Sequence, residues 1–126
     1  MHDIKSNIHI QESHSANSYN TGAQNGTALD LSKYESASFF ISLGSVGSAG
    51  TLNATLQMSD DNSTFINEDG STENDTAITQ LTAAGTAQLN VVRPQKQYYR
   101  VVATVGVNTV YFGAIAVAGP PRHVPA

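Results

Sequence analysis

The chain has 126 residues, a formal net charge of −4 and no cysteine, which fits one domain with a buried core and excludes disulfides and thiolate metal sites. Its six basic residues are scattered and only 13% of residues are charged, which argues against nucleic acid as a partner because phosphate binding needs a dense basic footprint. No uninterrupted apolar run is long enough for a membrane span, so we expect no membrane partner.

The first 26 residues differ from the rest of the chain, and we interpret them as an extended N-terminal arm. Residues 13–26 are rich in Ser, Asn and Gly, and such a composition does not offset the entropy cost of ordering by itself. Two interpretations stay open: a disordered or lightly tethered arm, and an arm that adds a strand to a neighbouring subunit. The first five residues lack the apolar core of a signal peptide, so we expect a protein made in the cytoplasm.

Short strands with polar turns fill residues 27–119. Alternation is clearest in residues 51–59, where every second side chain is apolar, and no segment shows sustained helical periodicity. This pattern predicts an all-β fold: a single antiparallel β-sandwich or jelly-roll-like domain of seven or eight short strands. Residues 120–126 are proline-rich and form a C-terminal tail that cannot continue a strand. Strands are predicted at residues 27–31, 37–43, 51–59, 64–66, 87–92 and twice within 97–119, with 77–81 as a short strand or one helical turn.

The most apolar stretch, residues 97–119, is interpreted as the central hairpin of the domain. Its two strands would meet at a tight turn over residues 106–108, where Gly and Asn adopt positive φ at low cost. Both faces of these strands are apolar, so one face must fill the core. The other face, with Val102, Ile115 and Val117, is a candidate oligomer contact, because exposed apolar patches mark interfaces.

No residue pattern points to catalysis or to a cofactor. Asp60, Asp61 and Asn62 offer oxygen ligands for calcium, but a turn selects the same residues, and we favour the turn. The histidines lack the spacing of zinc ligands, and no nucleophile elbow, phosphate loop or dinucleotide motif is present. We therefore expect no enzyme, no metal site and no cofactor. The histidines are His2, His9, His14 and His123.

The tyrosines offer a different candidate site. Tyr34, Tyr98, Tyr99 and Tyr111 are placed so that they would line a sugar-binding face, or would stand at the rim of a sheet with their hydroxyls reaching water. The absence of tryptophan weakens the sugar-binding interpretation.

Several segments resemble small structural proteins of tailed bacteriophages. Residues 56–65 resemble a hairpin of those proteins, "strand, Ser-Asp-Asp-Gly, Thr-Phe", with Asn62 in place of the usual glycine. Asn fits there because it tolerates the left-handed conformation. The same resemblance is carried by residues 29–37, by residues 97–102 with the strands that follow, and by the ending over residues 119–126. It covers residues 27–126 and leaves the arm outside.

The resemblance implies a virion protein of the capsid decoration, or cement, type. Such a protein is made in the host cytoplasm, binds the major capsid protein on the outer head surface and stabilises the shell, with a homotrimer expected at sites of local threefold symmetry. Two alternatives stay open: a head-fibre or tail-associated module that recognises host surface glycans, and a head–tail or tail structural protein. The expected capsid contacts lie in the arm and the tail: Ile4, Ile8, Ile10, Arg122, His123 and Val124.

Overall fold

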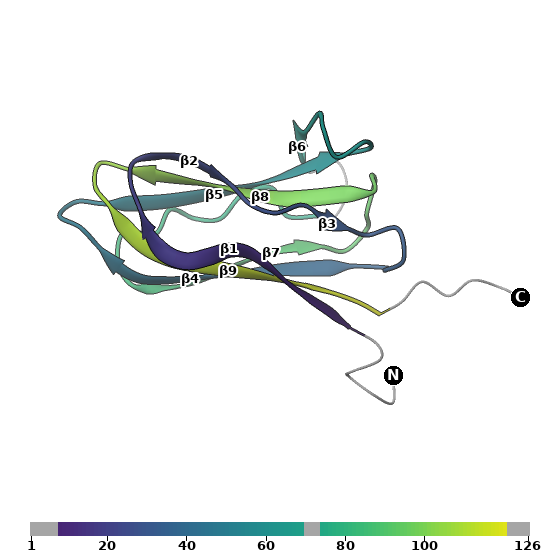
Figure 1. Ribbon diagram of the computed structural model, residues 1–126, viewed down its shortest axis with the longest axis horizontal. Coiled ribbons are helices and arrows are strands. Elements are labelled where there is room, and N and C mark those ends of the chain that lie inside the picture. Colours follow the sequence, from purple (N-terminus) through teal and green to yellow (C-terminus); the bar gives the residue numbers. More distant parts are fainter. Residues whose placement is uncertain (1–7, 70–73, 121–126) are drawn as a thin grey trace, which may run out of the picture.

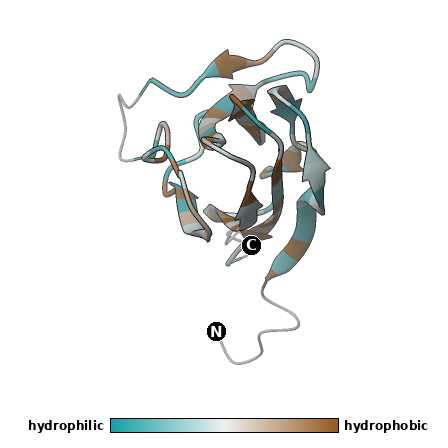
Figure 2. Ribbon diagram, turned by 90° about the vertical axis from the view of Figure 1, so that its left-hand side faces the viewer, coloured by the Kyte–Doolittle hydropathy of each residue, from teal (hydrophilic) through white to brown (hydrophobic). Residues whose placement is uncertain are grey.

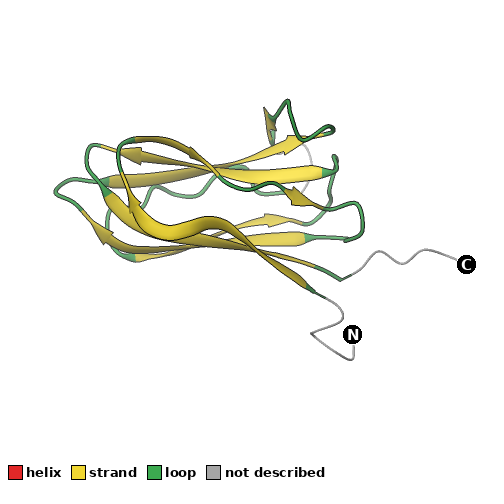
Figure 3. Cartoon of the chain, in the orientation of Figure 1, coloured by secondary structure: helices red, strands yellow, loops and turns green. Residues whose placement is uncertain are grey.

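The structure is a computed structural model that describes residues 8–69 and 74–120. Two antiparallel sheets pack face to face, and the described residues contain no helix (Figures 1 and 3). The prediction of an all-β sandwich is confirmed, with nine strands among the described residues instead of seven or eight. The strands are β1 (His9–Tyr19), β2 (Gly22–Asn25), β3 (Leu29–Asp30), β4 (Ala37–Val46), β5 (Thr51–Ser59), β6 (Ile66–Asn67), β7 (Gly85–Val91), β8 (Tyr98–Gly106) and β9 (Val110–Ala118).

The strand order is β1-β9-β4-β7 in one sheet and β2-β8-β5-β6 in the other, with β3 also paired to β8. The predicted central hairpin is therefore wrong in one respect: β8 and β9 do not pair with each other, and each lies in the middle of a different sheet. The alternating pattern identifies the inward face of each strand, but it does not say which strand is the neighbour.

The core fills the space between the two sheets. Its largest fully buried side chains include Tyr99 on β8, Phe39 on β4 and Phe112 on β9. The hydroxyl of Tyr99 accepts a hydrogen bond from the amide of Gln95 (2.8 Å) and donates to the sulfur of Met58 (3.6 Å). Figure 2 views the sandwich from one end and shows apolar and polar residues alternating along the strands, as expected for half-buried sheets.

Most of the predicted N-terminal arm belongs to the sandwich. β1 pairs with β9 from His9–Ala118 to Tyr19–Val110, and β2 pairs with β8. The arm prediction over residues 1–26 is thus wrong for residues 9–25. It failed because β1, an edge strand, buries few side chains and so can be almost entirely polar. Residues 1–7 of the arm and 121–126 of the tail lie outside the described residues.

Two turns bear on the sequence predictions. Asn62 has φ of 58°, so it adopts the left-handed conformation expected where glycine is usual. In the turn after β8, however, it is Val107 that takes positive φ, at 69°, and neither of its Gly and Asn neighbours does. Residues 77–81 form neither a helical turn nor a regular strand, but make isolated bridges to β5 at Leu81 and Ala77.

Candidate functional site

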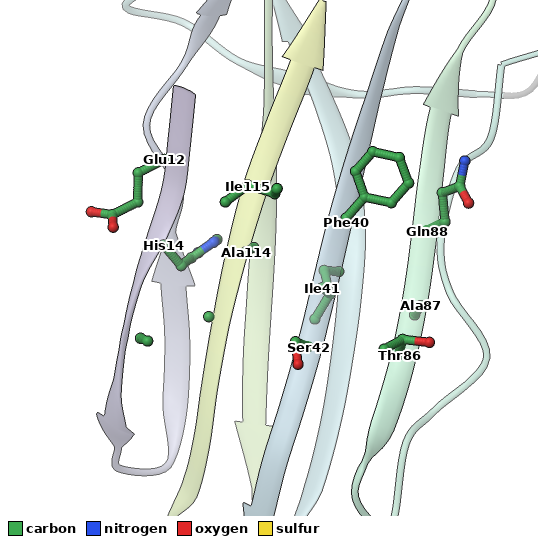
Figure 4. Close-up of a pocket in the computed structure, with 12 residues that line it drawn as sticks. Glu12, His14, Phe40, Ile41, Ser42, Thr86, Ala87, Gln88, Ala114 and Ile115 are labelled. Carbon is green, nitrogen blue, oxygen red and sulfur yellow. The ribbon is translucent and has the colours of Figure 1, made fainter. Parts of the chain in front are cut away.

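The candidate site is a groove of about 700 Å³ on the outer face of the β1-β9-β4-β7 sheet. Figure 4 shows its residues on all four strands, with Glu12 and His14 at one margin and Thr86 and Gln88 at the other. Glu12 is the one acidic residue that lines the groove, and the lining contains no Lys or Arg. The surface is therefore apolar to neutral across its centre.

The hollow follows from two adjacent rows of cross-strand neighbours. In one row Ile115 on β9 lies beside Phe40 on β4, which lies beside Gln88 on β7. In the next row Gly113 lies beside Ser42, and Ser42 beside Thr86. Because the second row carries only a glycine and short side chains, it forms a floor next to the ridge that the larger Ile and Phe side chains make.

Gly113 also permits the close approach of β1. A methyl group at this position would lie 3.0 Å from the Cα of Ala16 and 3.1 Å from its Cβ, which is closer than carbon atoms normally pack. Any side chain at residue 113 would push β1 away from β9, so this glycine fixes both the floor of the groove and its β1 margin.

Large apolar side chains gather on the same outer face. The exposed fractions are 60% for Ile10, 46% for Ile115, 44% for Tyr111 and 40% for Phe40. Val117 is half-buried between Ile10 and Ser38, its neighbours on β1 and β4. Exposed apolar side chains gathered on one face mark a surface that contacts another molecule.

His14 holds β1 in place at the margin of the groove. Two register shifts in β1 flank this residue, and the ring turns inward against Phe112, with a centroid distance of 5.3 Å. Its Nε2 bonds the carbonyl of Gln24 (2.9 Å) and its Nδ1 bonds the hydroxyl of Ser13 (3.2 Å). Burial lowers the pKa of His14, opposed by its bond to the Gln24 carbonyl. A neutral, fully bonded imidazole is a structural element here, tying β1 to β2.

The acidic turn after β5 is a turn in the structure, as favoured from the sequence. The Asp61 carboxylate accepts bonds from the amides of Thr64 and Ser63 and from the hydroxyl of Ser59, each at 2.9 Å. These donors, Thr64 foremost, lower the pKa of Asp61. Asp60 pairs with Lys96 at 2.8 Å. Within residues 8–69 and 74–120, no three His, Asp or Glu side chains are grouped so as to hold a metal ion.

The nine predicted contact residues fall into four groups. Ile10 lies next to Val117, and both share the outer face with Ile115, so one predicted capsid contact and two predicted oligomer contacts form one surface. Val102 lies on β8, on the outer face of the opposite sheet. Ile8 is half-buried beside β1. The remaining four, Ile4, Arg122, His123 and Val124, lie outside the described residues.

The predicted tyrosine platform does not form. Tyr99 is fully buried, Tyr98 belongs to one sheet and Tyr111 to the other, and Tyr34 stacks on His9 at 6.0 Å. Of the residues that line the groove, only Ile115 was among the predicted contacts, and sequence reasoning missed the others, Glu12, Phe40, Thr86 and Gln88 among them. The alternation of β4 had already placed Phe40 opposite the core-facing side chains, which is the signal that could have identified the groove. None of the described residues forms a helix suited to crossing a membrane.

Comparison with known proteins gives a likeness of fold. No family model matches the chain, and no curated protein matches its sequence. Among solved structures it is similar to the PBSX exported protein XepA, with a TM-score of 0.67 and 14% identity over 94% of this chain and 39% of XepA. It is similar to the SPBc2 prophage-derived protein YomS, with a TM-score of 0.58 and 10% identity over 88% of this chain and 91% of YomS.

A third similar structure comes from a subviral particle. VP2 of infectious bursal disease virus, in a subviral particle, matches with a TM-score of 0.59 and 12% identity over 90% of this chain and 32% of VP2. The chain thus spans well under half of XepA and of VP2, and nearly all of YomS.

Proposed function

We propose that the chain is a structural component of a bacteriophage particle, of the capsid decoration type. In this role it sits on the outer head surface, binds the major capsid protein and stabilises the shell. The outer face of the β1-β9-β4-β7 sheet is the attachment surface, and we expect no enzymatic activity. A homotrimer, which the sequence resemblance implies, would form where three copies meet on the shell.

The observation that carries this proposal is the apolar outer face itself. Ile10, Phe40 and Ile115 stand exposed around a groove whose lining has a single acidic side chain. A sheet face that is solvated in the functional state normally alternates to polar residues, so this face is built to be covered. The interface of one copy can be modest, because many copies bind the same shell.

The fold comparisons support the proposal at the level of architecture. A sandwich of this kind serves in VP2 of a subviral particle and in a prophage-derived protein. Together with the sequence resemblance to tailed-phage structural proteins, this favours a particle component over a metabolic role.

The test is binding to heads that lack the protein. Purified chain is mixed with such heads, and the bound fraction is measured by sedimentation and located by electron microscopy. Ile115→Asp, which places a charge in the attachment surface, is expected to lower affinity by tenfold or more. Val102→Asp is the matched control, because it places the same charge on the opposite outer face. Equal losses in both variants, or density on the tail instead of the head, would overturn the proposal.

The glycan-binding alternative has less support. The tyrosines that would have formed an aromatic platform are divided between the core and the two outer faces. A glycan array that shows binding abolished by Phe40→Ala would bring that alternative back, since Phe40 is the one Phe, Tyr or Trp side chain that lines the groove.

A further inference from the structure

The edge of β7 is an unprotected edge of this sandwich. β7 pairs only with β4, from Ala37–Val91 to Leu43–Gly85. In an antiparallel strand, the amide and carbonyl of one residue point to the same side, and successive residues alternate sides. Asn90 points away from β4, because its amide bonds the Asp75 carboxylate (2.8 Å) and its carbonyl accepts from the Asp75 amide (2.9 Å).

Thr86 and Gln88 therefore also direct their main-chain groups away from β4. Both residues are exposed, and no described residue bonds their main chain along this outer edge. Two adjacent amide–carbonyl pairs thus face solvent, between the bend at residues 83–84 and the position that Asp75 covers. A free edge of this kind is a template for another strand.

Parts of the other edges are covered. The carbonyl of Ser13 on β1 accepts from Thr27 (3.0 Å). Along β5, Leu52 exchanges two bonds with Leu81, each at 2.9 Å. Natural sheets also blunt an open edge with charge, proline or a bulge. The β7 sequence, GTAQLNV, has neither charge nor proline, and its pairing with β4 is regular.

We propose that β7 pairs with β7 of a second copy of this chain, antiparallel about a twofold axis at Ala87. This register sets Thr86 opposite Gln88 of the other copy and Gln88 opposite its Thr86. All four free amides and carbonyls then find partners, and the two four-stranded sheets become one continuous sheet.

A second copy is the occupant that the edge itself specifies. The free stretch is symmetric about Ala87, so a copy of the same stretch satisfies it completely. No charge on β7 opposes its own copy across the axis. The outer faces of the two copies then lie side by side, which doubles the apolar surface in one plane. Because only a few main-chain bonds join the copies, association is expected to be weak and concentration-dependent.

The experiment measures mass by light scattering as the concentration of the full chain rises. The wild type is expected to move from 13.3 kDa towards twice that value. Thr86→Lys with Gln88→Lys sets like charges opposite each other and should hold the chain at monomer mass, with an unchanged circular dichroism spectrum. Thr86→Lys with Gln88→Glu sets opposite charges together in the same register and should restore the dimer.

The rates of amide hydrogen exchange distinguish pairing through β7 from association through another surface. The amides of Thr86 and Gln88 should become slower to exchange as concentration rises, while those of Ala87 and Leu89, already bonded to β4, should not change. A wild type that stays monomeric at millimolar concentration, or a double-lysine variant that still associates, overturns the proposal, as does a trimer mass for the free chain in solution, where no shell brings three copies together. Ile115→Asp leaves the dimer intact, so failure of the head-binding proposal is distinguishable from failure of this one.

Discussion

Val107 offers the sharpest test of the backbone geometry. It is a β-branched residue with φ of 69°, and the amide of Asn108 bonds the carbonyl of Gly106 across it at 2.8 Å. This is a three-residue turn with its centre in the left-handed region, where an L side chain costs about 1–2 kcal/mol. The side chain is 73% exposed, so its packing contributes little in return.

Val107→Gly should therefore raise stability. Glycine also gives the unfolded chain more conformational entropy, which lowers the free energy of unfolding by about 0.4–1 kcal/mol. Because relief of the strain is larger, the free energy of unfolding should rise by about 0.5–1 kcal/mol. For a domain of this size that gain raises Tm by about 2–4 °C. Urea and thermal denaturation, followed by circular dichroism, measure both quantities.

Two controls isolate the cause of the gain. Val107→Ala keeps a Cβ atom and hence most of the strain, so it should change stability little. Val92→Gly replaces another exposed valine, one without positive φ, and should lower stability. A Val107→Gly variant no more stable than wild type would refute the assignment of strain to this turn.

Three further predictions concern buried or bonded polar groups. Because the pKa of His14 is lowered in the folded state, the unfolded chain takes up the proton first as pH falls, so stability should be level above about pH 6.5 and decline below it. Denaturation across pH 5–8 measures the slope of the free energy of unfolding against pH. The same slope should persist in the control variant His9→Gln, and a flat profile would contradict the prediction. Asp61→Ala should lower Tm more than Asp60→Ala, since the Asp61 carboxylate accepts the amides of Ser63 and Thr64, whereas Asp60 makes a surface ion pair with Lys96; equal melting curves would count against that. Asn74→Ala should lower the free energy of unfolding by about 2–4 kcal/mol, measured by urea denaturation, because the buried side-chain oxygen of Asn74 accepts hydrogen bonds from two main-chain amides at 2.8 Å. A loss below about 1 kcal/mol would show that water replaces this oxygen.

The strands from β4 onward could be predicted from alternation, because burial between two sheets imposes a period of two on their sequences. β1 and β2 could not, since an edge strand over a sandwich margin needs few apolar side chains. Ser13 and His14 are buried there with their polar atoms bonded, and composition alone does not show such bonding.

The candidate site was only partly predictable for a related reason. The outward positions of Ile115, Val117 and Phe40 follow from alternation within each strand. Their meeting with Ile10 and Gln88 depends on the order of strands in the sheet, which alternation does not fix. The same ignorance of strand order put Val102 on the face of Ile115, whereas the chain crosses to the other sheet between them.

The strand order also bears on how the protein is made. β8 lies between β2 and β5, and β9 lies between β1 and β4, so one inner strand of each sheet is among the last two strands of the sandwich to be synthesised. Until they emerge, β1 and β4 have no shared neighbour, and the earlier strands cannot close a core. The pairs that complete the sheets join opposite ends of the chain, such as His9 with Ala118, and contacts this distant in sequence form slowly. Closure of the core is thus deferred until β8 and β9 have been synthesised, and a nascent chain that stalls before residue 98 holds neither of these strands.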